Sequence, residues 1–241
     1  MEPGSPDGMT GKARPGTVSA GRPRRNIERG GPEKGETMTV IVGLVHKGRV
    51  HLGGDSAGVC GLRITVRRDP KIFRNGPYAM GFTTSFRMGQ LLHHAFKAPR
   101  PKGNMDAFMT TVFVDKLRTC LKNGGWARKD SEQEQAGTFL VGIHGRLFVI
   151  HDDYQVAEPA DGYAAVGCGN EFALGALHAT AELDLKPRRR LALALTAAEY
   201  HSAGVSAPFS YVTAAKAPAD ADGPHGRPLT AADIPPARRG R

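Results

Sequence analysis

The chain has 241 residues, of which 40% are hydrophobic and 7% aromatic, and its formal net charge is +10 at pH 7. This length is enough for one sizeable domain with an ordinary core. No run of about 18 uncharged apolar residues occurs, which argues against a membrane-spanning helix. The first residues, MEPGSPDGMTGKARPG, lack the apolar stretch of a secretory signal. A cytoplasmic protein without membrane association is therefore predicted.

The positive charge does not by itself indicate nucleic-acid binding. No aromatic residues are interleaved with the basic ones, as a surface that stacks bases would need. Solvated faces or tails are the preferred interpretation, so a nucleic-acid partner is not expected. The basic residues lie in short runs: 22–25, 67–68, 188–190 and 238–239.

The three cysteines, Cys60, Cys120 and Cys168, are far apart and odd in number. The chain contains no C-x-x-C pair and no H-E-x-x-H pattern. This usage argues against a disulfide framework and a dedicated zinc site. We therefore predict no cofactor.

Both ends of the chain differ in composition from its middle. Residues 1–37 and 214–241 are rich in small and polar residues and contain few large apolar side chains. Such segments bury too little surface to offset the entropy of ordering, so both are predicted to be disordered. The first is either a disordered extension or the product of a start assigned too early. The folded domain is expected to span residues 39–213.

The domain is expected to begin with a hairpin. A β-branched, apolar run opens it, Lys47-Gly48 supplies a tight turn, and a second strand returns. Residues 138–150 repeat this pattern around His144-Gly145. Strands are predicted at 39–45, 49–54, 62–68, 71–74, 77–82, 138–143, 146–150 and 163–166.

Helices are predicted after each group of strands. Apolar residues recur at helical spacing in the first pair, and the second pair is rich in Ala and Leu. The order of strands, two helices, strands and two helices predicts an α+β fold. Specifically, it predicts a four-layer αββα sandwich of two antiparallel sheets covered by helix pairs. The predicted helices span 88–96, 105–121, 170–183 and 187–203.

Four polar residues occupy positions where chemistry is plausible. Asp55 ends a strand after Gly53-Gly54, Lys71 begins a strand, and Thr39 precedes the first strand. Cys168 lies at the tip of a Gly-Cys-Gly turn. Each has an ordinary alternative, since such an Asp often makes a turn hydrogen bond, a Lys is often solvated and a Cys often fills the core. The combination is more specific than its parts.

The spacing of these residues resembles that of the proteasome β-subunits. It is closer still to the peptidase subunit of the bacterial two-component, ring-shaped ATP-dependent protease. In that family the mature chain begins with Thr, a strand ends in Gly-Asp, and a Lys follows. Here Asp55 follows Thr39 by 16 positions and Lys71 follows Asp55 by 16 positions. Gly81-Phe82 and 165–169 resemble two further family motifs, and the resemblance covers about 39–185.

The resemblance implies an N-terminal nucleophile hydrolase that cuts peptide bonds. Thr39 would be the nucleophile, its α-amine the base, and Asp55 and Lys71 the supporting ion pair. Two positions depart from the family: Thr84 stands where it has the oxyanion-hole glycine, and Cys168 where it has a serine. The resemblance also implies peptide or unfolded-protein substrates, a homo-oligomeric ring and an unfoldase ATPase as partner.

This chemistry requires Thr39 to be the first residue, because an acylated nitrogen cannot act as a base. Proteasome-type precursors cleave themselves, usually at Gly-Thr, whereas Met38 precedes Thr39 here. The preferred route is that Met38 is the true initiator and is removed by the ordinary aminopeptidase. Autocatalytic removal of a propeptide is the alternative.

Three other functions remain open at this point. The same nucleophile could act on a small amide in a monomeric or dimeric amidase. The fold could instead be a catalytically weak scaffold, or a basic one that binds nucleic acid or protein through its tails. Finally, Cys168 could be the nucleophile, with His151 or His178 as its base.

Overall fold

The structure is a computed structural model that describes residues 39–126, 128–130 and 133–216. The disorder predicted for 1–37 and for 217–241 lies outside the described residues. Ala214, within the predicted tail, is buried, and its N–H donates to Val50 O at 2.9 Å. In the part of the chain described, no helix is long and apolar enough to cross a membrane.

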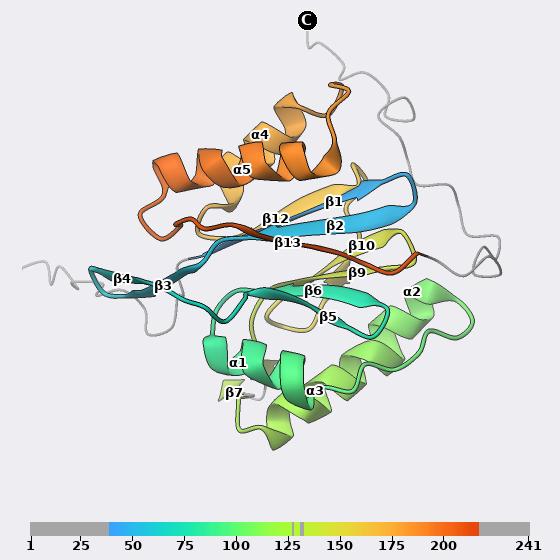
Figure 1. Cartoon of the computed structure of the whole chain (residues 1–241). Helices are drawn as coiled ribbons and strands as arrows, with labels where there is room; N and C mark the ends of the chain where they lie inside the picture. The colour runs from blue at the N-terminus through green and yellow to red at the C-terminus, as the bar shows by residue number, and fades with distance from the viewer. Residues whose placement is uncertain (1–38, 127, 131–132, 217–241) are drawn as a thin grey trace, which may run out of the picture. The chain divides into compact units, whose positions relative to one another are not determined.

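Strands and helices alternate along the described chain (Figure 1). The first group of strands is β1 (Val40–His46), β2 (Arg49–Gly54), β3 (Ala57–Cys60), β4 (Arg63–Val66), β5 (Ile72–Asn75) and β6 (Tyr78–Phe82). The helices that follow are α1 (Phe86–Gln90), η1 (Leu91–Ala95), α2 (Met105–Phe108), η2 (Met109–Phe113) and α3 (Val114–Asn123), where η marks π-helical turns. The second group is β7 (Arg128–Asp130), β8 (Gln133–Gln135), β9 (Phe139–Ile143), β10 (Arg146–Ile150), β11 (Val156–Ala157) and β12 (Tyr163–Gly167). The chain continues through α4 (Asn170–Ala179), α5 (Pro187–His201) and β13 (Ser210–Thr213).

In the described residues, these strands form two main antiparallel sheets. One has the order β12-β1-β2-β13 and the other β11-β10-β9-β6-β5. Helices α4 and α5 lie on the first sheet, and α1, α2 and α3 lie on the second (Figure 1). The predicted α+β class, with antiparallel sheets and helices, is confirmed.

The two predicted hairpins are confirmed, and their turns explain why they form. Lys47 and Gly48 have φ of 48° and 69°, and His144 and Gly145 have φ of 48° and 76°. Positive φ at both central residues is the signature of the type I′ turn, whose twist matches that of paired strands. A glycine in each turn makes this conformation accessible.

Strand β1 is buried on both faces, which explains its continuous apolar sequence. Val40, Val42 and Leu44 pack towards α4 and α5, whereas Ile41 packs between the two sheets. The inter-sheet cluster comprises Ile41, Val50, Leu52, Ile72, Ala79, Leu140, Leu147, Val149, Ala164, Val166 and Ala214. The start of β1, and therefore Thr39, is held by packing from both sides.

The predicted helices exist, but their bounds differ. The 88–96 prediction becomes α1 followed by η1, and the 105–121 prediction contains η2. The Asn75 side chain donates to Leu92 O and Phe96 O at 3.1 and 2.8 Å, satisfying carbonyls at the end of η1. The helix predicted to reach 183 ends at Ala179, and the Thr180 hydroxyl and N–H both donate to Ala176 O, at 2.8 and 3.2 Å.

The strand predictions missed several short strands. The predicted strand at 62–68 is the second arm of the β3–β4 ribbon. Strands β3, β7, β8, β11 and β13 were not predicted. β13 follows Pro208 and is only 4 residues long, and it exists through its pairing with β2, where Ser210 faces Gly54. Such a strand depends on a partner distant in sequence.

Candidate active site

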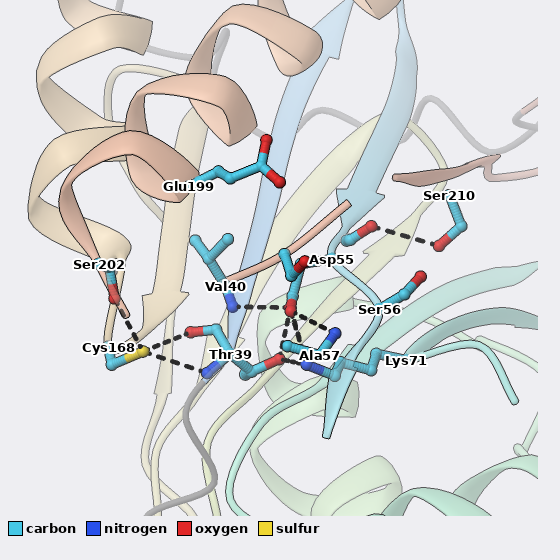
Figure 2. A network of polar contacts seen from close by, with 12 residues as sticks. Thr39, Val40, Asp55, Ser56, Ala57, Lys71, Cys168, Glu199, Ser202 and Ser210 are labelled. Atoms are coloured by element: carbon cyan, nitrogen blue, oxygen red, sulfur yellow. Dashed lines mark hydrogen bonds and ion pairs between the residues drawn. The ribbon is translucent and has the colours of Figure 1, made fainter. Parts of the chain in front are cut away.

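Thr39 lies immediately before β1, beside the strand β12. Thr39 is 1% exposed. The Thr39 hydroxyl donates to Asp55 Oδ1 at 2.6 Å and accepts a hydrogen bond from Lys71 Nζ. Figure 2 shows the three side chains converging on one point. The spacing in the sequence therefore corresponds to contact in space.

Asp55 is positioned by the end of β2. A Cβ at the preceding Gly54 would meet Ile41 and Ile72 at 3.0 and 3.1 Å, so glycine allows close packing here. The Asp55 carboxylate accepts from the backbone N–H groups of Val40 at 3.0 Å and Ala57 at 2.8 Å. These bonds fix the carboxylate to the first strand as well as to the nucleophile candidate.

Lys71 completes a buried ion pair with Asp55. Its Nζ lies 2.8 and 2.9 Å from the two carboxylate oxygens, and the residue is 2% exposed. Burial lowers the pKa of Lys71 below its ordinary value, and the charge of Asp55 opposes this shift. The Asp55 carboxylate therefore favours the charged form of Lys71 next to the Thr39 hydroxyl.

Cys168 lies on the other side of Thr39. Its Sγ accepts from the Thr39 backbone N–H at 3.2 Å and is 3.4 Å from Thr39 O. Gly167 makes this approach possible, because its φ is +99° and a Cβ there would lie 2.2 Å from Thr39 O. The thiol thus contacts the nitrogen that would become the α-amine.

Thr84 lies in the loop after β6 and does not join this cluster through hydrogen bonds. Among the described residues, its hydroxyl is paired with Thr83 and with Thr138 N–H, at 3.3 Å each. Its φ is +70°, a conformation that glycine adopts readily and threonine rarely. The backbone at this position is therefore in a left-handed conformation suited to glycine, although the residue is threonine.

By the resemblance, Thr84 stands where the family has its oxyanion-hole glycine. We therefore expect Thr84→Gly to increase kcat/KM for a peptide substrate, because it removes a side chain from that position. The melting temperature should change little. Relief of about 1–2 kcal/mol of backbone strain is offset by the higher entropy of glycine in the unfolded chain. Steady-state kinetics and thermal melting measure the two quantities. Thr84→Ala is the matched control, since it keeps a Cβ, and a fall in kcat/KM for Thr84→Gly would contradict the prediction.

Sequence reasoning missed Ser202, which follows α5. Its hydroxyl is 3.4 Å from Cys168 Sγ. Nothing in the local sequence marks this serine, because the contact joins residues far apart in the chain. The cysteine-nucleophile alternative gains no support: the described hydrogen bonds of Cys168 go to Thr39 and Ser202, whereas His178 pairs with the Tyr163 hydroxyl at 3.0 Å.

The fold and this arrangement at the start of β1 are similar to what the sequence resemblance implies, an N-terminal nucleophile hydrolase. No family model matches the chain. The "ATP-dependent protease subunit ClpQ" of Bacillus subtilis is 27% identical over 142 residues, covering 57% of this chain and 74% of the relative. The protein of the same name from Bacillus licheniformis is 28% identical over 165 residues, covering 64% and 86%.

Solved structures agree on the fold. Thiobacillus denitrificans BPH aligns with a TM-score of 0.65 at 21% sequence identity, covering 75% of this chain and 100% of BPH. With the curated relatives, this likeness confirms the resemblance stated from the sequence. The chain is similar to the peptidase subunits of bacterial ATP-dependent proteases.

Proposed function

We propose that this chain hydrolyses peptide bonds with Thr39 as its nucleophile, once Thr39 is the first residue. The observation that carries the proposal is the Thr39 hydroxyl held between Asp55 and Lys71. A threonine hydroxyl is a poor nucleophile and needs a base nearby. The free α-amine of Thr39 would be that base.

The charge of Lys71 suits this role of the amine. A terminal amine has a pKa of about 7.7–8.0, close to working pH, as a general base requires. A neighbouring ammonium disfavours a second positive charge, so Lys71 would keep the amine free of its proton. Asp55 holds Lys71 in place and favours its charged form. The Thr39 hydroxyl can then pass its proton to the amine as it attacks the carbonyl.

The attack produces a tetrahedral oxyanion that needs N–H donors. By its resemblance, Thr84 would supply one from its backbone, and one such donor is typically worth about 10²–10³ in rate. Collapse of this intermediate breaks the C–N bond as the protonated α-amine gives its proton to the leaving nitrogen, which releases the amine product and leaves an ester on Thr39. Water, with the α-amine again as base, releases the second product.

The decisive measurement is the identity of the first residue in active protein. We expect N-terminal sequencing and intact mass to find Thr39 first, whichever route removes the preceding residues. Active protein that still carries residues 1–38 would refute the mechanism.

The proposed catalytic domain spans 39–213, and the four-layer αββα sandwich is its proposed architecture.

The lowered pKa of Lys71 predicts a pH dependence. Because Lys71 acts as a cation, the alkaline limb of kcat/KM should fall at a pH below 10.5, the ordinary lysine value. The folded protein loses this proton before the unfolded chain does, so the Lys71 contribution to the free energy of unfolding rises with pH between the two pKa values. A pH–rate profile beside thermal melts measures both. An alkaline limb at or above the ordinary value would contradict the prediction.

Exposed apolar residues support assembly into a homo-oligomeric ring. In the β3–β4 ribbon, Leu62, Ile64 and Val66 are 106%, 46% and 55% exposed. A two-stranded ribbon is marginally stable alone in water, and exposed apolar patches often mark interfaces. The Bacillus relatives are named subunits of an ATP-dependent protease. An unfoldase ATPase is therefore the proposed partner of this chain, and unfolded protein is its proposed substrate. The proposed location is the cytoplasm.

Native mass measurement tests this assembly. We expect a large ring, and Leu62→Asp should shift the protein towards smaller species by placing a charge in the interface. An active monomer or dimer would favour the amidase alternative over the ring protease.

A further inference from the structure

Arg67 and Phe86 form a stacked pair beside the active-site lysine. The Cζ atom of Arg67 lies 3.7 Å from the centroid of the Phe86 ring. The same ring lies 5.7 Å from Lys71 Nζ, the atom that donates to the Thr39 hydroxyl. The Arg67 side chain is 35% exposed, whereas that of Lys71 is buried. The stacked pair is therefore an accessible surface next to the proposed nucleophile, and the reaction described above does not use it.

Phe86 is held in place by the start of α1. It is the first residue of this helix, and the hydroxyl of Ser85, which caps the helix, accepts from Arg87 N–H at 3.1 Å. The ring of Phe82 packs against it at a centroid distance of 5.9 Å and an interplanar angle of 82°. Phe86 thus offers a fixed aromatic surface for Arg67.

Arg67 is itself held at three points besides the ring. Its backbone N–H donates to Ser56 O at 2.8 Å, and its Nε and Nη2 donate to the two carboxylate oxygens of Asp69 at 2.9 and 2.6 Å. Gly58 leaves room for the side chain, because a Cβ at that position would lie 2.7 Å from Arg67 Cδ. The orientation of the guanidinium is therefore set before a substrate arrives.

The free hydrogen-bonding capacity of this surface consists of donors. A guanidinium has five N–H groups, and Asp69 accepts two of them. Among the described residues, the other three have no acceptor, and they include the edge formed by Nη1 and the second N–H of Nη2. An ionised carboxylate fits such an edge, and its charge-assisted hydrogen bonds are about twice as strong as neutral ones. Both oxygens of Asp69 already accept from Arg67.

We propose that Arg67 binds an acidic side chain of the peptide substrate, at the residue whose carbonyl is attacked. This inference rests on the proposed function, in which Thr39 attacks that carbonyl beside Lys71. A basic substrate side chain would meet the guanidinium with no free acceptor near it, and an apolar one would leave the donors to water. The preferred substrates are therefore peptides with Glu or Asp at that residue.

The first test compares two peptides that differ only at that residue, Glu in one and Gln in the other. The kcat/KM of the Glu peptide should exceed that of the Gln peptide about 10-fold, the effect of a charge-assisted hydrogen bond at a partly exposed site. Arg67→Gln should bring this ratio to within about 2-fold. Burial lowers the pKa of Lys71, and the charge of Arg67 lowers it further. The ratio cancels any change at Lys71, because both peptides experience it alike.

Arg118 provides the matched control. Its Nε donates to Glu134 at 2.8 Å and its Cζ lies 6.0 Å from the centroid of the Tyr154 ring, so it too is paired with a carboxylate beside an aromatic ring. Arg118→Gln should leave the ratio of the two peptides unchanged. Arg67→Lys should give an intermediate ratio, because lysine keeps the charge but lacks the planar fork.

A second measurement does not depend on peptidase activity. In Thr39→Ala the proposed nucleophile is absent, and calorimetric titration with the same two peptides measures their dissociation constants. The Glu peptide should bind about 10-fold more tightly than the Gln peptide. This preference should disappear in the Thr39→Ala/Arg67→Gln double variant and weaken as the salt concentration rises.

The outcomes separate the specificity from the proposed function. Equal kcat/KM values and equal affinities for the two peptides, or a Glu preference that survives Arg67→Gln, overturn the inference and leave Thr39 as the nucleophile. Hydrolysis by Thr39→Ala at the parent rate would instead remove the proposed function. A Glu preference that Arg67→Gln abolishes would support the role of Arg67 in that case as well.

Discussion

Thr39→Ala is expected to abolish peptidase activity while the protein keeps its fold. The substitution removes the only atom proposed to attack the substrate, so the loss of kcat should be about 10⁴-fold or more. The Asp55 carboxylate retains its bonds from Lys71, Val40 N–H and Ala57 N–H, so the melting temperature should change modestly. Hydrolysis of a fluorogenic peptide and thermal melting by circular dichroism measure the two effects.

A distant threonine provides the control for this variant. Thr110 is exposed on a helix, and its hydroxyl donates to carbonyls of the preceding turn, Asp106 O at 2.7 Å and Ala107 O at 3.3 Å. Thr110→Ala should match the parent protein in rate. If Thr39→Ala hydrolysed peptides as fast as Thr110→Ala, the nucleophile would have to be sought elsewhere, beginning with Cys168.

Lys71→Ala is expected to lower both stability and activity. The Asp55 side chain is 0% exposed, and without Lys71 its charge loses its buried partner. Breaking a buried ion pair in this way typically costs about 3–5 kcal/mol. The rate should also fall, by about 10²- to 10³-fold, because the positive charge at the reacting hydroxyl is lost. Chemical denaturation and steady-state kinetics are the appropriate measurements.

The control is a lysine in an exposed ion pair. Lys122 is 69% exposed in its side chain and lies 3.6 Å from Glu134. Such surface pairs contribute about 0–1 kcal/mol, so Lys122→Ala should alter neither stability nor rate appreciably. A Lys71→Ala protein that unfolds at the same denaturant concentration as Lys122→Ala would show that the Asp55–Lys71 pair is not the buried, coupled unit described above.

Part of the site could be predicted because it is encoded locally. Thr39 and Asp55 lie at facing ends of one hairpin, and the pairing of Ile41 with Gly54 brings them together. Lys71 lies immediately before β5, a strand of the neighbouring sheet. The type I′ turn residues fix the register of the hairpin, so spacing along the chain translates into position in space.

Other features depend on contacts between residues that are far apart in the sequence. Ser202 reaches Cys168 across 34 residues, and Cys168 reaches Thr39 across 129. The positive φ of Thr84 also contradicts the preference of its own side chain, and the surrounding loops impose it. Strand β13 likewise forms through pairing with β2. In each case tertiary packing, rather than local propensity, determines the outcome.

The network around Asp55 is complete while Thr39 N is still a peptide nitrogen in the 241-residue chain. In the proposed mechanism, exposing the α-amine of Thr39 therefore requires no rearrangement of these contacts. A chain that still carried residues before Thr39 would be folded but inactive. It would lack the free α-amine of Thr39, whereas its active-site side chains would already be in place. Cleavage of the peptide bond before Thr39 would then activate the protein. Activity would appear at the rate of that cleavage, without a slower conformational change after it.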